Sequence, residues 1–464
     1  MSSDRRKFLK QLGSTVALTS AALSGLSAIE TRETRILQAE KRVSSNDNIR
    51  IATIGMGIMG FNDTKAALTC PGVELVACCD LYKGRLIRAK EVFGAHIYTT
   101  ANYHEILERK DVDAIIIATS DNWHSTIAIA AMHKGKAVYS EKPMVHYISE
   151  GLNEIKAQQE TKAIFQVGSQ RISSIAFLKA KELYQAGAIG QINSIEASFN
   201  RQSALGAWQY TIPPDASTET VGWDQFQAND TTRHAYDPNR FFRWRNYREY
   251  GTGVAGDLFV HLLTGIHFMT NSKGPDKIFA IGGTYYWKDG RNVPDVMSAV
   301  IEYPETQEHP AFQANLRVNF ISGEGDRTST KIIGSEGVID LFGEGDGFTI
   351  HKSKMPAAPG IGGWDSLDTY PEAMQKTILD AYNKKYSTAD QQAPAIPGVT
   401  YQSPQGYNAS NDHFANFMDA IRTGKPIVEN AVFGFRAAAP CLACNDSYFQ
   451  NKVIHWDAEK MQIV

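Results

Sequence analysis

The chain has 464 residues, of which 43% are hydrophobic and 21% are charged, so it is long enough for two or three domains with buried cores. This composition excludes an intrinsically disordered protein, and the formal net charge of −3 argues against nucleic acid as a partner. The five cysteines are an odd number, which is not the pattern of a disulfide framework. Cys441 and Cys444 lie in an alanine-rich helical pattern without a second ligand pair nearby, which predicts a structural role and no metal site.

The N-terminus has the pattern of an export signal. Arg5 and Arg6 precede a mildly apolar run over residues 12–26, which is typical of a twin-arginine signal. We expect this signal over residues 1–28, a polar linker or arm over 29–46, and a periplasmic or otherwise exported protein that uses the twin-arginine export machinery. The alternative is a chance pair of arginines. No later segment has 18 consecutive apolar residues, so we expect no membrane span in the mature protein.

Strands and helices alternate in the next part of the chain. Buried parallel strands are predicted at 49–54, 73–79, 114–118, 137–139 and 163–167. Helices are predicted at 84–93, 125–134 and 149–161. This alternation predicts an α/β Rossmann dinucleotide-binding domain with a doubly wound parallel sheet over residues 47–168.

The remaining chain has a different pattern. Strands are predicted at 192–200, 278–287, 296–303, 312–321, 331–333, 338–341 and 453–456. Helices are predicted at 175–186, 256–269, 371–386, 412–422 and 435–449. Because few helices separate these strands, residues 169–464 are predicted to form an α+β substrate and oligomerisation domain with a large open, mostly antiparallel sheet. An aromatic insertion occupies residues 201–250.

A glycine motif, G-x-G-x-x-G, follows the first predicted strand directly. Glycines in this position allow a tight turn, close approach of the backbone to a pyrophosphate, and close packing of the next helix. The predicted phosphate-binding residues are Gly55, Gly57, Met59 and Gly60. The alternative is a tight turn that binds no nucleotide.

An acidic residue stands at the expected distance from the glycines. Asp80 ends the second predicted strand, where a carboxylate binds the ribose hydroxyls of NAD. Arg85 lies close enough in sequence to reach a 2′-phosphate, so NAD is the predicted cofactor and NADP stays open.

Several segments resemble the Gfo/Idh/MocA oxidoreductases (glucose–fructose oxidoreductase, inositol dehydrogenase and relatives). The resemblance rests on Thr119–His124, Ala131–Lys136 and the Glu-Lys-Pro element at 141–143. It continues through Gly253–His261 and 413–417, and so covers nearly the whole mature chain. It implies a nicotinamide-dependent enzyme that acts on a sugar or a cyclitol.

The resemblance also implies roles for three residues. Lys142 matches a lysine near the nicotinamide and the reacting carbinol, His261 matches an acid/base histidine, and Asp257 matches its partner carboxylate. These roles are chemically sensible because a hydride leaves a carbinol carbon only as the hydroxyl proton is removed, and a neutral histidine can take that proton. The alternatives are a surface ion pair for Lys142 and a core histidine for His261, although His267 has the better claim to the core.

Further residues are assigned to the cofactor and the substrate. Residues predicted to line the nicotinamide side are Thr119, Asn122, His124, Glu141 and Lys142. His124 could instead cap its helix. Predicted substrate-binding residues are Arg171, Trp223, Arg243, Trp244 and His261. Aromatic faces suit the C–H faces of sugar rings, and arginines can bind hydroxyls or a carboxylate; the alternative for the insertion is packing or an oligomer contact.

The function predicted from these residues is oxidoreduction of a CH–OH group of a sugar, glycoside or cyclitol by a nicotinamide that is held tightly. One alternative is an NAD-dependent glycoside hydrolase that uses transient oxidation. Since one hydrolase branch replaces the lysine of the Glu-Lys-Pro element, Lys142 favours redox chemistry. A second alternative is a non-catalytic sugar-binding protein. A homo-oligomer is expected by analogy with the open sheet of the family.

Overall fold

The computed structural model describes residues 48–230 and 232–464. The predicted signal over 1–28, with Arg5 and Arg6, and the predicted linker over 29–46 lie outside the described residues. Within the described ranges, no helix combines the length and the hydropathy that a membrane crossing requires.

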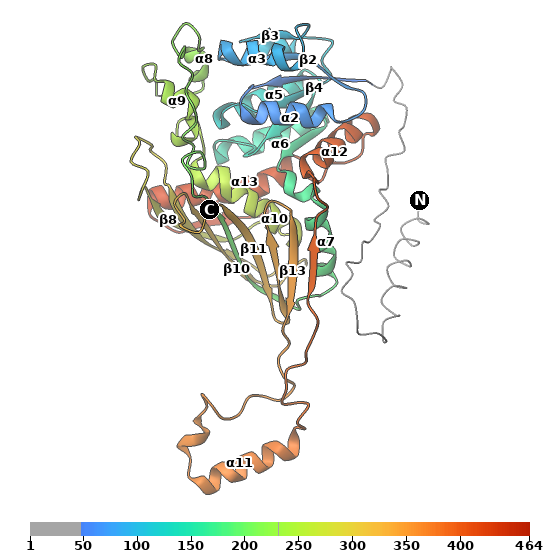
Figure 1. The fold of residues 1–464 in the computed structure, drawn as a ribbon, viewed down its shortest axis with the longest axis vertical. Coiled ribbons are helices and arrows are strands. Elements are labelled where there is room, and N and C mark those ends of the chain that lie inside the picture. The colour runs from blue at the N-terminus through green and yellow to red at the C-terminus, as the bar shows by residue number, and fades with distance from the viewer. Residues whose placement is uncertain (1–47, 231) are drawn as a thin grey trace. The chain divides into compact units, whose positions relative to one another are not determined.

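The first domain is built on a six-stranded parallel sheet with the order β3-β2-β1-β4-β5-β6, drawn with its helices in blue to teal in Figure 1. Its strands are β1 (Ile49–Ile54), β2 (Val73–Cys79), β3 (Tyr98–Thr100), β4 (Ala114–Ile117), β5 (Ala137–Glu141) and β6 (Phe165–Gly168). Its helices are α2 (Ile58–Leu68), α3 (Lys83–Phe93), α4 (Tyr103–Leu107), α5 (His124–His133) and α6 (Ile148–Thr161). The prediction of a doubly wound parallel sheet is confirmed. The strand order reverses between β1 and β4, the place where such sheets bind ligands.

The second domain is built on a ten-stranded sheet with the order β14-β13-β12-β11-β7-β10-β9-β8-β15-β16. Its strands are β7 (Ile192–Asn200), β8 (Lys277–Gly283), β9 (Val296–Tyr303), β10 (Phe312–Asn319), β11 (Arg327–Gly334), β12 (Gly337–Phe342), β13 (Gly347–Lys352), β14 (Val399–Gln402), β15 (Ile454–Asp457) and β16 (Gln462–Ile463). Neighbouring strands are antiparallel except for β7 and β10, which confirms the mostly antiparallel sheet.

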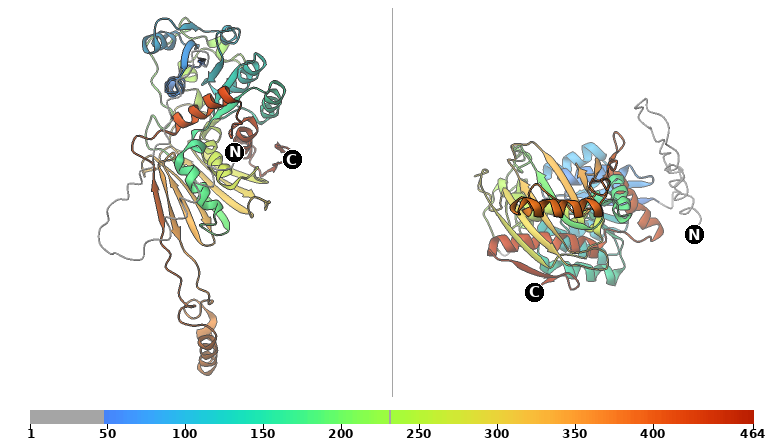
Figure 2. Two further views of the ribbon diagram at one scale, coloured as in Figure 1. Left: turned by 90° about the vertical axis from the view of Figure 1, so that its right-hand side faces the viewer. Right: turned by 90° about the horizontal axis from the view of Figure 1, so that it is seen from below.

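Helices cover one face of this second sheet, as the left view of Figure 2 shows. They include α7 (Ile175–Gln185), α10 (Val260–Thr270) and α13 (Ala431–Gln450). Burial alternates along β8, β9 and β10, because successive side chains of a strand point to opposite faces. One face therefore forms the core, and the other is open.

Some elements differ from the sequence-based expectation. The strand predicted to reach residue 287 ends at Gly283, because the carboxylate of Asp295 accepts hydrogen bonds from the backbone N–H groups of residues 285–287. The helix predicted at 256–269 begins with a π-helical turn, η5 (Ala255–Phe259), before α10 starts. The short strand β3 and the pair β13 and β14 were not predicted.

The C-terminal part of the chain completes the core of the first domain. Helix α12 (Ala409–Thr423) lies beside α2 in Figure 1 and packs against it. Its Phe414 ring stacks on Tyr139 of β5 at 4.2 Å between centroids, and Phe417 is fully buried in the same cluster. The two domains therefore share a hydrophobic core, and the first domain depends on residues far away in sequence.

We expect Phe417→Ala to lower the free energy of unfolding by about 3–5 kcal/mol, because the ring leaves a cavity that its neighbours fill only in part. Thermal unfolding followed by circular dichroism measures this loss. Met374→Ala, on the exposed face of α11 (Glu372–Lys385), is the control and should leave the midpoint unchanged. Equal midpoints for the Phe417 variant and the wild type would contradict the shared core.

Candidate active site

A cavity of about 940 Å³ lies between the two domains. Its walls include the glycine loop, the carboxyl ends of parallel strands, the aromatic insertion and the first turn of α10. This volume is at the upper end of the range for ligand sites, about 300–1,000 Å³, and the position is the one expected for the fold.

The three motif glycines each meet a separate steric requirement. Gly55 has φ +93°, a conformation that favours glycine, and a Cβ there would lie 2.5 Å from the carbonyl oxygen of Ala118. A Cβ on Gly60 would lie 1.9 Å from the carbonyl oxygen of Gly55, so a side chain would push α2 away from β1. No atom lies within 4 Å of a Cβ built on Gly57, which lines the cavity. This open backbone fits a dinucleotide pyrophosphate, with Met59 also in the wall.

Asp80 lies at the carboxyl end of β2, next to this loop. One of its carboxylate oxygens accepts the N–H of Met56 at 2.7 Å, and the other accepts the N–H of Tyr82 at 2.8 Å. The guanidinium of Arg85 lies 3.6 Å from the carboxylate and also lines the cavity. A fixed carboxylate here suits two ribose hydroxyls, while Arg85 keeps a cation within reach of a 2′-phosphate.

Lys142 and Asp257 form an ion pair between the domains. The Nζ of Lys142, just after β5, donates to Oδ1 of Asp257 and to its backbone carbonyl, both at 3.0 Å. Arg245 Nε donates to the same Oδ1 at 3.2 Å. Burial alone would raise the pKa of Asp257, but the charges of Lys142 and Arg245 hold it well below its usual range. The carboxylate is therefore ionised and holds the lysine ammonium in place.

His261 lies in the first turn of α10 and lines the same cavity. Burial lowers its pKa well below the usual value, and the positive charges of Lys142 and Arg171 lower it further. The imidazole is therefore neutral at pH 7 and can accept a proton. His267 is fully buried with Nε2 2.9 Å from the hydroxyl of Tyr303, which makes it the core histidine.

The remaining predicted cofactor residues do not all reach the cavity. Thr119, His124 and Glu141 line it, but Asn122 does not; its side chain is engaged with Ser120 at 2.7 Å. His124 is the first residue of α5, and its ring nitrogens face two backbone carbonyls rather than capping the helix. Burial raises the pKa of Glu141, whose carboxyl accepts a hydrogen bond from Gln170 at 3.1 Å.

Three predicted substrate residues lie outside the cavity wall. Trp223 stacks on Phe226 and donates Nε1–H to the carbonyl of His234, so it packs the insertion. Arg243 donates to the carbonyl of Tyr210, which fixes a loop instead of contacting a substrate. Arg171 is buried directly behind the wall. Trp244 and His261 do line the cavity.

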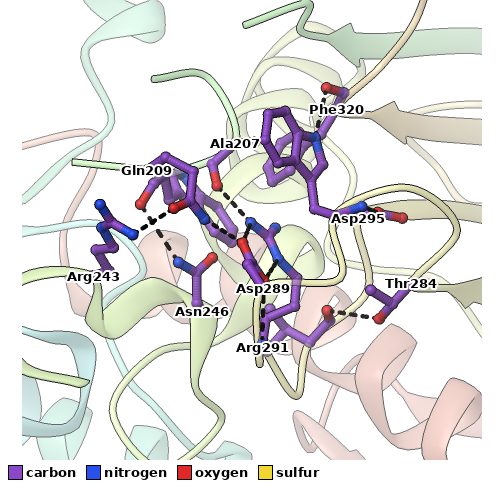
Figure 3. A network of polar contacts seen from close by, with 12 residues as sticks. Ala207, Gln209, Arg243, Asn246, Thr284, Asp289, Arg291, Asp295 and Phe320 are labelled. Atoms are coloured by element: carbon purple, nitrogen blue, oxygen red, sulfur yellow. Dashed lines mark hydrogen bonds and ion pairs between the residues drawn. The ribbon is translucent and has the colours of Figure 1, made fainter. Parts of the chain in front are cut away.

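The loop at residues 207–210 carries two cavity aromatics of the predicted aromatic insertion, Trp208 and Tyr210, which were not among the individually assigned substrate residues. Trp208 has φ +62°, which a large side chain rarely adopts. Figure 3 shows what holds this loop: Arg291 donates to the carbonyl of Ala207 at 2.8 Å, and Asn246 donates to that of Trp208 at 3.4 Å. These contacts hold the loop that forms this part of the cavity wall.

Other residues missed from sequence are Phe199, Arg201 and Glu344, which all line the cavity, as does Arg245 of the predicted aromatic insertion. Phe199 and Arg201 lie at the end of predicted strand 192–200, so the strand end was an available signal. Glu344 follows β12, and nothing in its sequence neighbourhood links it to the site.

Comparisons with known proteins agree with this geometry. A family model described as "Oxidoreductase family, NAD-binding Rossmann fold" matches residues 49–169, and a model of the GFO/IDH/MocA C-terminal domain matches 226–340. Inositol 2-dehydrogenase of Salmonella typhimurium (strain LT2) is 30% identical over 175 residues, which are 37% of this chain and 51% of that protein. A glycosyl hydrolase family 109 protein of Shewanella baltica (strain OS185) is 32% identical over 171 residues, 34% of this chain and 37% of that protein. The chain thus matches about half or less of these relatives.

Solved structures share the fold. A levoglucosan dehydrogenase in complex with NADH and L-sorbose has a TM-score of 0.62 at 18% identity, and the match covers 88% of this chain and 98% of that one. Fold, glycine loop and Asp80 together define an NAD-binding Rossmann oxidoreductase domain joined to a sheet-rich second domain. The chain belongs to the Gfo/Idh/MocA family of oxidoreductases.

We expect Gly57→Ala to weaken NADH binding at least tenfold while the nucleotide-free protein keeps its unfolding temperature, because the added methyl meets no protein atom and only obstructs the pyrophosphate. Fluorescence titration of nucleotide-free protein with NADH measures the affinity. Gly60→Ala, whose methyl would strike the Gly55 carbonyl, should lower both affinity and unfolding temperature. Wild-type affinity in the Gly57 variant would place the cofactor elsewhere.

Proposed function

We propose that this chain is an NAD(P)-dependent dehydrogenase that oxidises a CH–OH group of a sugar, glycoside or cyclitol. The observation that carries the proposal is the buried Lys142–Asp257 pair, which lies beside a neutral His261 at the carboxyl end of the parallel sheet. The similarity to inositol 2-dehydrogenase supports the substrate class.

Each side chain has a defined task in this reaction. The bound nicotinamide supplies a hydride acceptor. His261 takes the hydroxyl proton as the hydride leaves the carbinol carbon. The product is then a neutral carbonyl group and not a protonated one. The ammonium of Lys142 stabilises the developing alkoxide, and Asp257 orients that ammonium.

We expect Lys142→Ala and His261→Ala each to reduce turnover by about 10²–10⁴-fold in a folded protein, as for loss of a positioned acid or base. Steady-state formation of NADH with a panel of sugars and cyclitols measures this effect. The exposed neighbours Lys134→Ala and His133→Ala are matched controls and should keep full turnover. Because the pKa of His261 is lowered, the neutral base persists as pH falls, so kcat/KM should stay level through about pH 6.5. Near-normal turnover in both site variants would contradict the assignment.

The similarity to a glycosyl hydrolase family 109 protein favours a second candidate, an NAD-dependent glycoside hydrolase that uses transient oxidation. The presence of Lys142 favours net redox chemistry instead. The two candidates differ in product: net NADH and an oxidised sugar in one case, a free aglycone without net NADH in the other.

We also propose that the protein is exported through the twin-arginine route with its cofactor bound, on the strength of Arg5 and Arg6. Outside the cytoplasm little free NAD is available for exchange. A nicotinamide cofactor that stays bound and is reoxidised in the same site does not need to exchange with free NAD.

We expect the double variant Arg5→Lys, Arg6→Lys to remain in the cytoplasm of a bacterial host that exports the wild type to its periplasm. Immunoblots of the fractions measure location, and mass spectrometry of small molecules released on denaturation measures bound nucleotide. Both proteins should release about one NAD per chain, because the cofactor binds before export. Exported protein without nucleotide would overturn the captive-cofactor proposal.

We propose a homo-oligomer that forms through the open face of the ten-stranded sheet. Phe279, Ile281 and Val300 project from this face, and each is more than a third exposed. Contiguous exposed apolar side chains on a sheet are typical of an interaction surface.

A further inference from the structure

Arg171 is a buried cation without an adequate partner. Its side chain is 3% exposed, and its Nε and Nη2 atoms have no hydrogen-bond partner among the described residues. The carboxylate of Glu344 lies 3.8 Å away, beyond hydrogen-bond distance, on a side chain that is 57% exposed. Leaving a buried guanidinium so poorly paired is costly, so this arrangement is typical of a group kept for a ligand.

A second guanidinium lies near the same aromatic ring as the first. Arg201 lines the cavity and lies 5.2 Å from the centroid of the Phe199 ring, while Arg171 lies 5.6 Å from the same ring. The ring of His261 is 5.7 Å from Phe199. Both cations are therefore placed beside the proposed base.

The charges at this end of the cavity do not balance. Lys142 and Arg245 share the single carboxylate of Asp257. Arg171 faces the half-exposed Glu344, and Arg201, whose charge also acts on Asp257, has no ion pair among the described residues. The four cations thus outnumber the carboxylates of Asp257 and Glu344, and this excess of positive charge suits an anionic group on the substrate.

From cavity-lining Arg201 and the unpaired buried guanidinium of Arg171 behind the same wall, we propose that the substrate is a sugar acid whose carboxylate binds Arg201 and is attracted by the charge of Arg171. This inference rests on the proposed dehydrogenase function and names its substrate class. Planar guanidinium groups suit a carboxylate because they present paired N–H donors, and low solvent access strengthens the contact. Glu344 occupies the carboxylate position in part and is displaced toward solvent when the substrate binds.

Calorimetric titration of the NADH-loaded protein tests this inference. The probes are D-glucuronate, D-galacturonate and D-gluconate, each compared with its neutral parent sugar, and D-glucose 6-phosphate. We expect at least one acid to bind more than tenfold tighter than its parent. Arg201→Gln should abolish this preference, Arg201→Lys should retain part of it, and Glu344→Gln should increase it by removing a competing carboxylate.

The outcomes separate this inference from the dehydrogenase proposal, because binding is measured without turnover. If an acid binds preferentially but yields no NADH in the steady-state assay with NAD, the result would support the acid site and count against the dehydrogenase. Equal binding of acids and parents, a preference unchanged in Arg201→Gln, or stronger binding of the phosphate than of every acid would overturn the inference.

Discussion

The buried carboxylate of Asp257 is the interaction on which the site depends. An ionised carboxylate in this position is stable only because cations approach it from two separate parts of the chain. Lys142 comes from the end of β5 in the first domain, and Arg245 comes from the aromatic insertion. Separating the domains would take Lys142 away from Asp257, so this ion pair and the shared core around α12 both oppose such opening.

The π-helical turn before α10 gives this ion pair its geometry. In a regular helix, residues four apart, such as Asp257 and His261, share a face. In the structure Asp257 lies within the wider π turn, and Lys142 Nζ contacts both its carboxylate and its carbonyl. Such turns are frequent at functional sites. The lysine is thereby held by two acceptors instead of one.

The sequence was informative where local pattern determines structure. The strands β1, β2, β7 and β9 have the predicted bounds, because a run of apolar or alternating residues ending in turn residues defines a strand by itself. The end of β8 was missed because of Asp295, which directly precedes β9. Its carboxylate accepts hydrogen bonds from the backbone N–H groups of Tyr286 and Trp287, which a longer strand would use for pairing.

The same distinction explains the site. Gly55, Gly57, Asp80 and Lys142 follow strand ends, which are visible in sequence, and they line the cavity as predicted. Gly60 was also predicted to contact the phosphates, but it lies outside the wall and packs against the Gly55 carbonyl. Trp223 and Arg243 have side chains that suit a sugar, but in the folded insertion they contact other parts of the chain. Trp223 donates to the carbonyl of His234, and Arg243 donates to that of Tyr210. No spacing rule brings Glu344 to Arg171, since the pair is separated by most of the second domain.

The charges that we assign to substrate binding also affect the base. The positive charges of Lys142 and Arg171 lower the pKa of His261, which keeps it neutral but makes it a weak proton acceptor. In the proposed complex, a substrate carboxylate beside Arg171 offsets part of this positive potential and raises the proton affinity of the imidazole. The base is then strengthened at the moment when the carbinol is in place, and it stays weaker while the cavity holds no acid. Substrate charge thus contributes to binding and to proton transfer through the same arginine.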